Sequence, residues 1–206
     1  FWDEELLKQG SFITFRRWEA LGFLSLWARR FQKELTGGEE RLQMHYIPGA
    51  LGEAIPASRL LSPPSAEEVQ NMFQHRLREE REKELEQGVS LVGPHRDDVR
   101  FLIDGQDLAI YGSRGQQRSA ALSLRLAEME FITQTSQKVP ILLLDEVMSE
   151  LDARRREHLM KLVVKAQQVI ITTTDWGIFQ RDFLSQANLL TVRQGMITPL
   201  SEPSGL

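Results

Sequence analysis

Apolar residues recur at helical spacings from Phe1 to about Leu35, with polar residues between them. This pattern predicts one long amphipathic helix, broken near Gly10-Ser11, whose wide apolar face packs on other helices. Thr36-Gly37-Gly38 is the expected end of that helix. Weak alternation then predicts a strand over Leu42–Ile47, and Pro48–Pro64 has the composition of a connector.

A second helix is predicted to start at Ser65, because Glu68 three residues later completes a capping-box pattern. Its expected end is Gly88. Acidic and basic residues are mixed over Arg78–Glu86, which favours an exposed helix with i,i+4 ion pairs over a binding tail.

Beyond Gly88 the pattern changes to short apolar runs bounded by turn residues. The predicted strands are Val89–Val92, Val99–Ile103 and Leu108–Tyr111. Asp104-Gly105, between the last two, is a strong hairpin signal. We therefore expect a helical arm subdomain with its connector over residues 1–88, and a sheet-containing domain over residues 89–206.

From Arg118 onward, helical and strand patterns alternate. The predicted elements are a helix at Ser119–Thr133, a strand at Val139–Leu144, a helix at Ala153–Val164, a strand at Val169–Thr172 and a final hairpin of Leu189–Val192 with Met196–Leu200. Alternation of this kind predicts a parallel sheet flanked by helices, and the fold class is therefore α/β.

Composition narrows the function classes only slightly. The chain of 206 residues is 41% hydrophobic and 26% charged, as in an ordinary soluble protein, and its net charge of -4 gives no global attraction to nucleic acid. Without cysteine it has neither disulfides nor thiolate metal sites. No apolar run approaches the ~18 residues of a membrane span. Because the sequence starts at Phe1 instead of methionine, we expect it to be part of a longer protein.

The residues best suited to chemistry lie between Tyr111 and Asp152. The apolar run Ile141–Leu144 ends in two carboxylates, Asp145 and Glu146, at the carboxyl end of a predicted parallel strand, where open α/β sheets bind ligands. An aspartate there can hold Mg²⁺ through its water shell, and a glutamate beside it can orient or deprotonate water. The alternative is that the two carboxylates only end the strand at the solvent boundary.

A polar turn precedes the helix upstream of that strand. Ser113 and Gly115 stand where free backbone amides and the helix dipole favour an anion, and Gln116, Gln117 and Arg118 add polar or cationic contacts. Alone, this turn would more often be an ordinary loop. Followed by a helix and a strand that ends in Asp-Glu, it predicts a site for nucleotide phosphates.

Three segments, in this order, resemble the signature motif, the Walker B strand and the D-loop of ABC-type ATPase heads. They are Gly112–Gln116, Ile141–Glu146 and Ser149–Asp152. Two longer strings, Leu91–Asp98 and Tyr111–Leu124, are similar to the RecF family, bacterial DNA-repair proteins related to the structural-maintenance-of-chromosomes ATPases. The resemblance implies part of an ABC-type ATPase head, with a mixed sheet flanked by helices, and a helical arm.

By that resemblance the complete protein would bind ATP and Mg²⁺ and form an ATP-dependent homodimer, in which the signature turn of one subunit contacts the nucleotide held by the other. Asp145, as the water-mediated magnesium residue, and Glu146 would be catalytic. The resemblance assigns nucleotide contacts to Ser113, Arg114, Gly115, Gln116, Asp152 and Thr174. It also implies a cytoplasmic protein that binds gapped DNA or single/double-strand junctions and assists recombinase loading with RecR and RecO, away from membranes.

Two departures from general ABC ATPases affect this interpretation. No G-x-x-x-x-G-K-[ST] occurs anywhere, so the loop that cradles the phosphates is missing and the chain alone is expected neither to bind ATP tightly nor to hydrolyse it. Thr172-Thr173-Thr174-Asp175 replaces the usual histidine after the next strand. Since a threonine hydroxyl cannot act as a titrating base, slow hydrolysis is expected of the complete protein.

Several alternatives stay open from the sequence. The segment His95–Asp98 could bind metal or contact the nucleotide region, or it could form a hydrogen-bonded turn. Arg154-Arg155-Arg156, at a helix start, suits either a negatively charged partner or a solvated helix end. The rival function is a non-catalytic module that binds DNA or a repair partner through arginines on an ABC-like scaffold. A transporter ATPase is disfavoured by the long amphipathic segment at the start.

Overall fold

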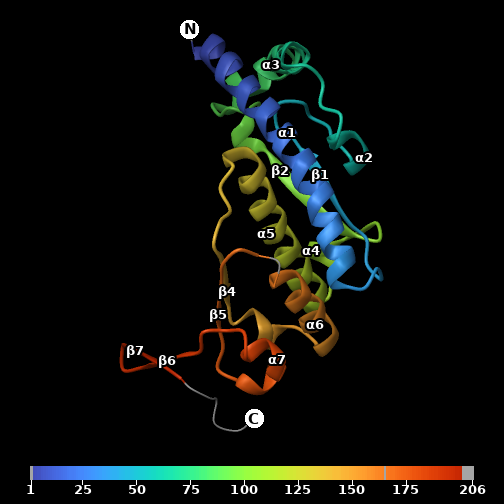
Figure 1. Cartoon of the computed structure of the whole chain (residues 1–206). Helices are drawn as coiled ribbons and strands as arrows, with labels where there is room; N and C mark the ends of the chain where they lie inside the picture. The colour runs from blue at the N-terminus through green and yellow to red at the C-terminus, as the bar shows by residue number, and fades with distance from the viewer. Residues whose placement is uncertain (1, 165, 201–206) are drawn as a thin grey trace. The chain divides into compact units, whose positions relative to one another are not determined.

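The computed structural model describes residues 2–164 and 166–200, as a mixed α/β protein of helices and small sheets (Figure 1). Contacts divide the chain into two compact units, the first extending to Pro140 and the second beginning at Ile141. The subdomain boundary predicted at Gly88 lies within the first unit and stays a prediction. None of the described helices combines the length and apolar character needed to cross a membrane.

The first unit is built around α1, which spans Trp2–Leu35 without a break. Gly10 does not interrupt the helix; it leaves room for a neighbour, because a Cβ atom there would lie 2.7 Å from Cζ of Phe73. Gly22 does the same for α2 (Ala57–Leu60), where a Cβ atom would lie 2.5 Å from the carbonyl oxygen of Leu60. Glycines inside α1 therefore mark close helix packing.

Packing of α1 against α5 (Arg114–Ser136) includes a buried polar contact. Ser123 Oγ of α5 donates to Gln32 Oε1 of α1 at 2.7 Å, and Gln32 Nε2 donates to Glu40 Oε2 at 2.7 Å. Gln32 and Ser123 are both fully buried, so each needs its partner in the other helix. Phe23 and Phe131 pack edge to face, 5.2 Å apart. These contacts fix how α5 lies along α1.

The second long helix, α3 (Ala66–Gln87), begins and ends where its sequence predicts. Ser65 Oγ accepts from the Glu68 amide at 3.2 Å, and the Glu68 carboxylate accepts from the Ser65 amide at 2.7 Å. Gly88 ends the helix in the left-handed region, at φ 65°. Both helix-end predictions are confirmed.

Three strands form an antiparallel sheet in the order β1 (Leu42–Ile47), β2 (Asp98–Ile103) and β3 (Gln106–Asp107). Asp104-Gly105 joins β2 to β3, with φ of 51° and 83°, as the hairpin signal predicts. Leu42, Met44 and Tyr46 of β1 are buried.

One edge of this sheet is only partly covered by a neighbouring strand. β3 pairs with Leu102 and Ile103 alone, so Asp98–Phe101 has no strand on that side among the described residues. The amide of Val99 on this stretch donates to Asp98 Oδ1 at 2.8 Å. The Asp98 side chain therefore partly blocks the edge of the strand to which it belongs.

Two of the predicted strands are wrong. Leu108–Tyr111 forms the short helix α4, because Asp107 Oδ1 accepts from the Ala109 amide at 2.9 Å and caps a helical turn. Val89–Val92 forms no strand, since the Glu84 carboxylate accepts from the amides of Leu91 and Val92 at 2.7 and 3.1 Å. In both cases a nearby carboxylate binds the backbone amides that a strand would have needed.

The segment His95–Asp98 is held by hydrogen bonds around Asp97, which follows the 3-10 turn η1 (Pro94–Arg96). Asp97 Oδ2 accepts from Arg17 Nη1 at 2.6 Å and from the Tyr46 hydroxyl at 2.7 Å, and Oδ1 accepts from the Gly49 amide at 2.9 Å. Burial, and then the Asp97 hydrogen bond, raises the pKa of Tyr46. Asp97 thus joins α1, β1 and the turn, which favours the structural interpretation.

The second unit contains a parallel pair of strands, β4 (Leu142–Asp145) and β5 (Val169–Thr172), as predicted. Its helices are α6 (Ala153–Val163) and α7 (Arg181–Leu184), and the short 3-10 turns are η2 (Val147–Glu150) and η3 (Trp176–Ile178). The final hairpin, β6 (Leu190–Arg193) with β7 (Met196–Pro199), is antiparallel as expected. Leu143 and Ile170, on the two parallel strands, are 67% and 50% exposed.

Replacing Asp97 by Ala should lower the free energy of unfolding by about 3 kcal/mol, because three donors lose a buried acceptor. The neighbouring substitution Asp98→Ala is the control, since its exposed carboxylate accepts from the next amide and should cost about 0.5 kcal/mol or less. Urea unfolding followed by circular dichroism measures both. Equal losses for the two variants would contradict the role given to Asp97.

Candidate functional site

The predicted phosphate turn is the capped start of α5. Ser113 Oγ accepts from the Gln116 amide at 3.2 Å, and Gln116 Oε1 accepts from the Ser113 amide at 3.0 Å, which together form a capping box. The helix therefore begins at Arg114, five residues before the predicted start at Ser119. The Ser-x-x-Gln spacing would have shown this start, as the same spacing did at Ser65.

Capping leaves part of this helix end available for a ligand. The Gln116 amide is taken by Ser113, while the amides of Arg114 and Gly115 precede the first backbone bond of the helix, which the Gln117 amide makes to the Ser113 carbonyl. The Ser113 hydroxyl keeps its hydrogen for donation, since its oxygen is the acceptor of the bond from the Gln116 amide. With the helix dipole, these donors suit an anion.

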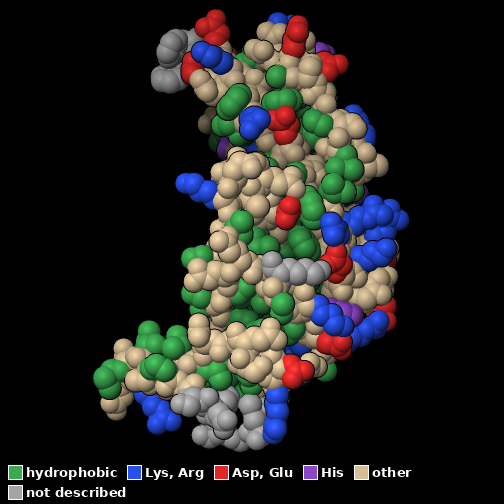
Figure 2. Space-filling model, in the orientation of Figure 1, with side chains coloured by type: hydrophobic (Ala, Val, Ile, Leu, Met, Phe, Trp, Pro, Cys, Tyr) green, Lys and Arg blue, Asp and Glu red, His purple; other side chains and the backbone are tan. Residues whose placement is uncertain are grey.

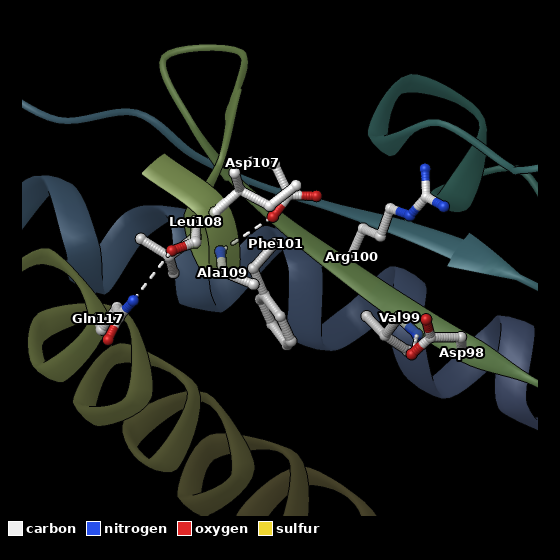
Figure 3. Close-up of a pocket in the computed structure, with 9 residues that line it drawn as sticks. Asp98, Val99, Arg100, Phe101, Asp107, Leu108, Ala109 and Gln117 are labelled. Atoms are coloured by element: carbon white, nitrogen blue, oxygen red, sulfur yellow. Dashed lines mark hydrogen bonds between the residues drawn. The ribbon is translucent and has the colours of Figure 1, made fainter. Parts of the chain in front are cut away.

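A cavity of about 760 Å³ lies next to this turn, between the open edge of β2 and α4 (Figure 3). Gln117 Nε2 donates to the carbonyl oxygens of Leu108 and Gly112, at 3.2 and 3.3 Å, and so ties α4 to the start of α5. Asp98 and Asp107 line the cavity together with one cation, Arg100. This lining does not suit a phosphate, and the cavity is not part of the predicted phosphate site.

The acidic pair lies in the second unit, at the carboxyl ends of the parallel strands. Asp145 ends β4 and stands in register with Thr172, which ends β5. Thr172 Oγ1 donates to Asp145 Oδ1 at 2.5 Å and accepts from the Glu146 amide at 3.1 Å. The strand registers thus bring one threonine hydroxyl to both predicted catalytic residues.

Glu146 has an unusual backbone conformation, with φ of 53° in the left-handed region. Such a conformation costs an L-residue about 1–2 kcal/mol and is often found at functional sites. Ser149, in η2, holds the residue from the other side: its Oγ donates to the Glu146 carbonyl oxygen at 2.7 Å and lies 3.4 Å from Oε2. The conformation of Glu146 is therefore fixed by hydrogen bonds on both of its peptide groups.

Asp152, assigned to the nucleotide by resemblance, is the N-cap of α6. Its Oδ1 accepts from the Arg155 amide at 2.9 Å, and Oδ2 pairs with Arg155 Nη1 at 3.1 Å. The Arg155 amide, followed by its charged side chain, lowers the pKa of Asp152. At least one of the three consecutive arginines, Arg155, therefore binds the N-cap residue of α6. That residue, Asp152, carries the negative charge that is favourable at a helix N-terminus.

Thr174 is exposed in the loop after β5, and its side chain makes no hydrogen bond to the residues that the structure describes. Its neighbour Thr173 closes a local turn, with Oγ1 donating to the Asp175 carbonyl oxygen at 2.9 Å. Of the three consecutive threonines, Thr172 is the one that contacts the acidic pair, and the sequence analysis does not assign it to the site. The sequence places Thr172 at the end of a predicted strand, but the pairing of that strand with β4, which brings Thr172 to Asp145, is visible only in the structure.

Within the described ranges, no group of three or more His, Cys, Asp or Glu side chains is arranged to hold a metal ion. Asp145 nevertheless fits a water-mediated contact to Mg²⁺, because it is exposed and Thr172 engages only its Oδ1. Phosphates and water supply most ligands in sites of this kind. Asp145 and Glu146 are thus brought together in the second unit, and Ser113–Gln116 in the first.

Comparisons with curated proteins and with solved structures both find RecF proteins. No family model matches the chain. It is 38% identical over 200 residues to the DNA replication and repair protein RecF of Herpetosiphon aurantiacus, covering 97% of this chain and 48% of that protein. It is 39% identical over 196 residues to RecF of Lysinibacillus sphaericus, covering 95% and 51%. The chain spans about half the length of these curated relatives.

A solved structure of the recombination mediator protein RecF-ATP in the RecFOR pathway superimposes with a TM-score of 0.73 at 29% identity. The match covers 97% of this chain and 49% of that one. The mixed α/β arrangement is therefore that of RecF proteins, as the motifs predict.

Replacing Glu146 by Gly should give a more stable protein than replacing it by Ala, by about 1 kcal/mol, because glycine adopts a φ of 53° without the Cβ penalty. Both variants remove the same carboxylate, so the difference between their free energies of unfolding reports the cost of the left-handed backbone conformation. Unfolding in urea, fitted for both variants, measures it. An alanine variant as stable as the glycine variant would show that the residue is unstrained.

Proposed function

We propose that this chain, as part of a RecF-family protein of DNA replication and repair, supplies the signature turn, the Walker B carboxylates and the D-loop of an ATP-dependent repair protein. The observation that carries the proposal is the acidic pair at the carboxyl ends of two parallel strands, held by Thr172 and Ser149. ATP binding is supported by the RecF-ATP structure that the chain resembles.

In this proposal the acidic pair acts on a nucleotide bound to the same subunit. Asp145 holds a water of the Mg²⁺ shell, and the ion, when bound, neutralises charge on the phosphates. Glu146 accepts a proton from the attacking water or orients it. Thr174 lies in the loop after β5 and contacts the γ-phosphate through its hydroxyl. Because no histidine follows β5, turnover is slow and suits a switch.

The start of α5 acts across a homodimer. Arg114 and Gly115 present their backbone amides to the γ-phosphate held by the partner, and Ser113 presents its hydroxyl. The side-chain nitrogen of Gln116 and the exposed Arg114 cation lie beside them. Asp152 lies near the dimer seam, where the start of α6 follows the acidic pair. The capping box supports this role, since it holds the amides of the turn in place before the nucleotide arrives.

The macromolecular partners follow from the family. We propose that the complete protein binds gapped DNA or single/double-strand junctions and assists recombinase loading with RecR and RecO; the RecFOR pathway of the related structure supports this. With a net charge of -4, DNA contact needs a local basic surface. Figure 2 shows Lys and Arg side chains gathered beside the C-terminal half of α1, where Arg29, Arg30 and Lys33 are exposed.

A second function, that of a non-catalytic DNA- or partner-binding module, is favoured for this chain by itself. The sequence contains no G-x-x-x-x-G-K-[ST] to cradle the phosphates, so the turn and the acidic pair cannot make a complete nucleotide site within one copy. Tests of the nucleotide roles therefore require a RecF protein that includes this chain and is as long as its relatives.

Ser113→Arg should abolish ATP-dependent dimerisation, because a long cation replaces the hydroxyl that faces the partner's nucleotide. Loss of the helix cap alone costs about 1 kcal/mol, and Ser65→Arg, which removes the same kind of capping box from α3, is the matched control. Sedimentation with and without ATP measures both. If Ser65→Arg and Ser113→Arg both dimerise like the parent protein, the trans role is wrong.

Glu146→Gln should lower the ATP turnover rate by about 10²–10³-fold and lengthen the life of the ATP-bound dimer, because the amide cannot accept the proton while its shape is kept. Phosphate release measures turnover, and dimer dissociation after dilution measures the lifetime. Unchanged turnover would remove Glu146 from the catalytic role without affecting the assignment of the turn.

A further inference from the structure

We propose that Thr172 is a positioning residue that sets both catalytic carboxylates for ATP hydrolysis. The inference rests on the proposed function and deepens it, because Thr172 belongs neither to the Walker B strand nor to the signature turn. Among the residues that the structure describes, its hydroxyl is the one group that contacts both the side chain of Asp145 and the backbone of Glu146.

The direction of each hydrogen bond follows from chemistry. The Glu146 amide can only donate, so Thr172 Oγ1 is the acceptor of that 3.1 Å bond. The hydroxyl hydrogen is then left for Asp145 Oδ1, at 2.5 Å. One hydroxyl thus satisfies a carboxylate oxygen and an amide in adjacent residues, and only a side chain with both a donor and an acceptor can keep both bonds.

This contact fixes which oxygen of Asp145 remains for other partners. With Oδ1 engaged by Thr172, Oδ2 is the oxygen available for a metal-bound water. Partners of this kind, which orient a metal-side carboxylate without touching the metal, typically change metal affinity or activity by 10–100-fold when removed. Thr172 acts in this way on Asp145.

The second contact stabilises the unusual backbone at Glu146. Its φ of 53° is unfavourable for a residue with a Cβ atom, and the peptide groups on either side are held by Thr172 Oγ1 and Ser149 Oγ. Without the threonine acceptor, the Glu146 amide loses its partner among the described residues. The Glu146 carboxylate would then sample more than one direction.

The strand register explains why position 172 has this role. Asp145 and Thr172 are Cα partners at the ends of two parallel strands, so their side chains leave the sheet at the same level. The next threonine, Thr173, uses its hydroxyl within its own turn, with Asp175. The strand end and the loop that follows it therefore have separate hydroxyls, and only the first reaches the acidic pair.

The test compares Thr172→Val, which keeps the shape but loses the hydroxyl, with Thr172→Ser, which keeps the hydroxyl. Thr198→Val, on the exposed strand β7, is the matched control for the chemical change. In the full-length RecF protein, Thr172→Val should lower turnover by about 10–100-fold and raise the Mg²⁺ concentration needed for half-maximal rate, while Thr172→Ser stays within about threefold of the parent.

A second readout does not depend on hydrolysis. Hydrogen exchange of the peptide that contains Glu146 should quicken in Thr172→Val, because its amide loses an acceptor, and return to the parent rate in Thr172→Ser. A Thr172→Val protein with parental turnover and Mg²⁺ dependence would overturn the inference, even if exchange quickens. Loss of activity in both the valine and the serine variants would also overturn it, because the hydroxyl would not be the cause.

ATP binding and hydrolysis by the unsubstituted parent protein distinguish a failure of the proposed function from a failure of the role of Thr172. If the parent neither binds nor hydrolyses ATP, the proposed function is wrong and the positioning role falls with it. If the parent hydrolyses ATP and Thr198→Val and Thr172→Val are equally active, the proposed function stands and the role of Thr172 alone is wrong.

Discussion

The packing of α5 against α1 is the contact on which the first unit depends. Its buried centre is polar: Gln32 and Ser123 are fully enclosed and bond to one another, so sliding one helix along the other would leave both unsatisfied. An apolar contact of the same size would tolerate small shifts. The position of the turn at the start of α5 is therefore defined by a contact more than two helical turns away along the same helix.

The turn itself shows that structural and functional uses of one residue are compatible. Ser113 accepts a hydrogen bond to begin the helix and still has a hydrogen to donate, and Gln116 gives its side-chain oxygen to the same cap. A capped helix end has fewer conformations than a free loop, so less entropy is lost when an anion binds. Local stability at this turn thus prepares it for a ligand.

Much of the fold follows from local sequence signals, and the failures have local causes too. Ser65 and Gly88 delimit α3 because caps act within a few residues, and the same rule applied to Ser113 would have given the start of α5. The segments at Leu91 and Leu108 do not form the predicted strands, because nearby carboxylates bind their backbone amides. Hydrophobic periodicity does not detect such contacts.

The candidate site was predictable only in part. Asp145 and Glu146 are adjacent in sequence, so the acidic pair could be found from the apolar run before it. Thr172 lies 27 residues from Asp145, and its contact depends on the relative register of two parallel strands, which no short pattern encodes. Asp97 depends on long-range contacts in the same way, because its partners Arg17 and Tyr46 lie 80 and 51 residues away in the sequence. The local sequence therefore leaves a ligand site and a hydrogen-bonded turn both open.

The self-blocked edge of β2 has a consequence for how this protein behaves in a crowded solution. An open strand edge invites pairing with any extended peptide, and a carboxylate that occupies one edge amide both removes a donor and repels a neighbouring backbone carbonyl. Asp98 therefore lowers the tendency of this strand edge to pair with extended peptides, which favours a protein that stays dispersed at high concentration.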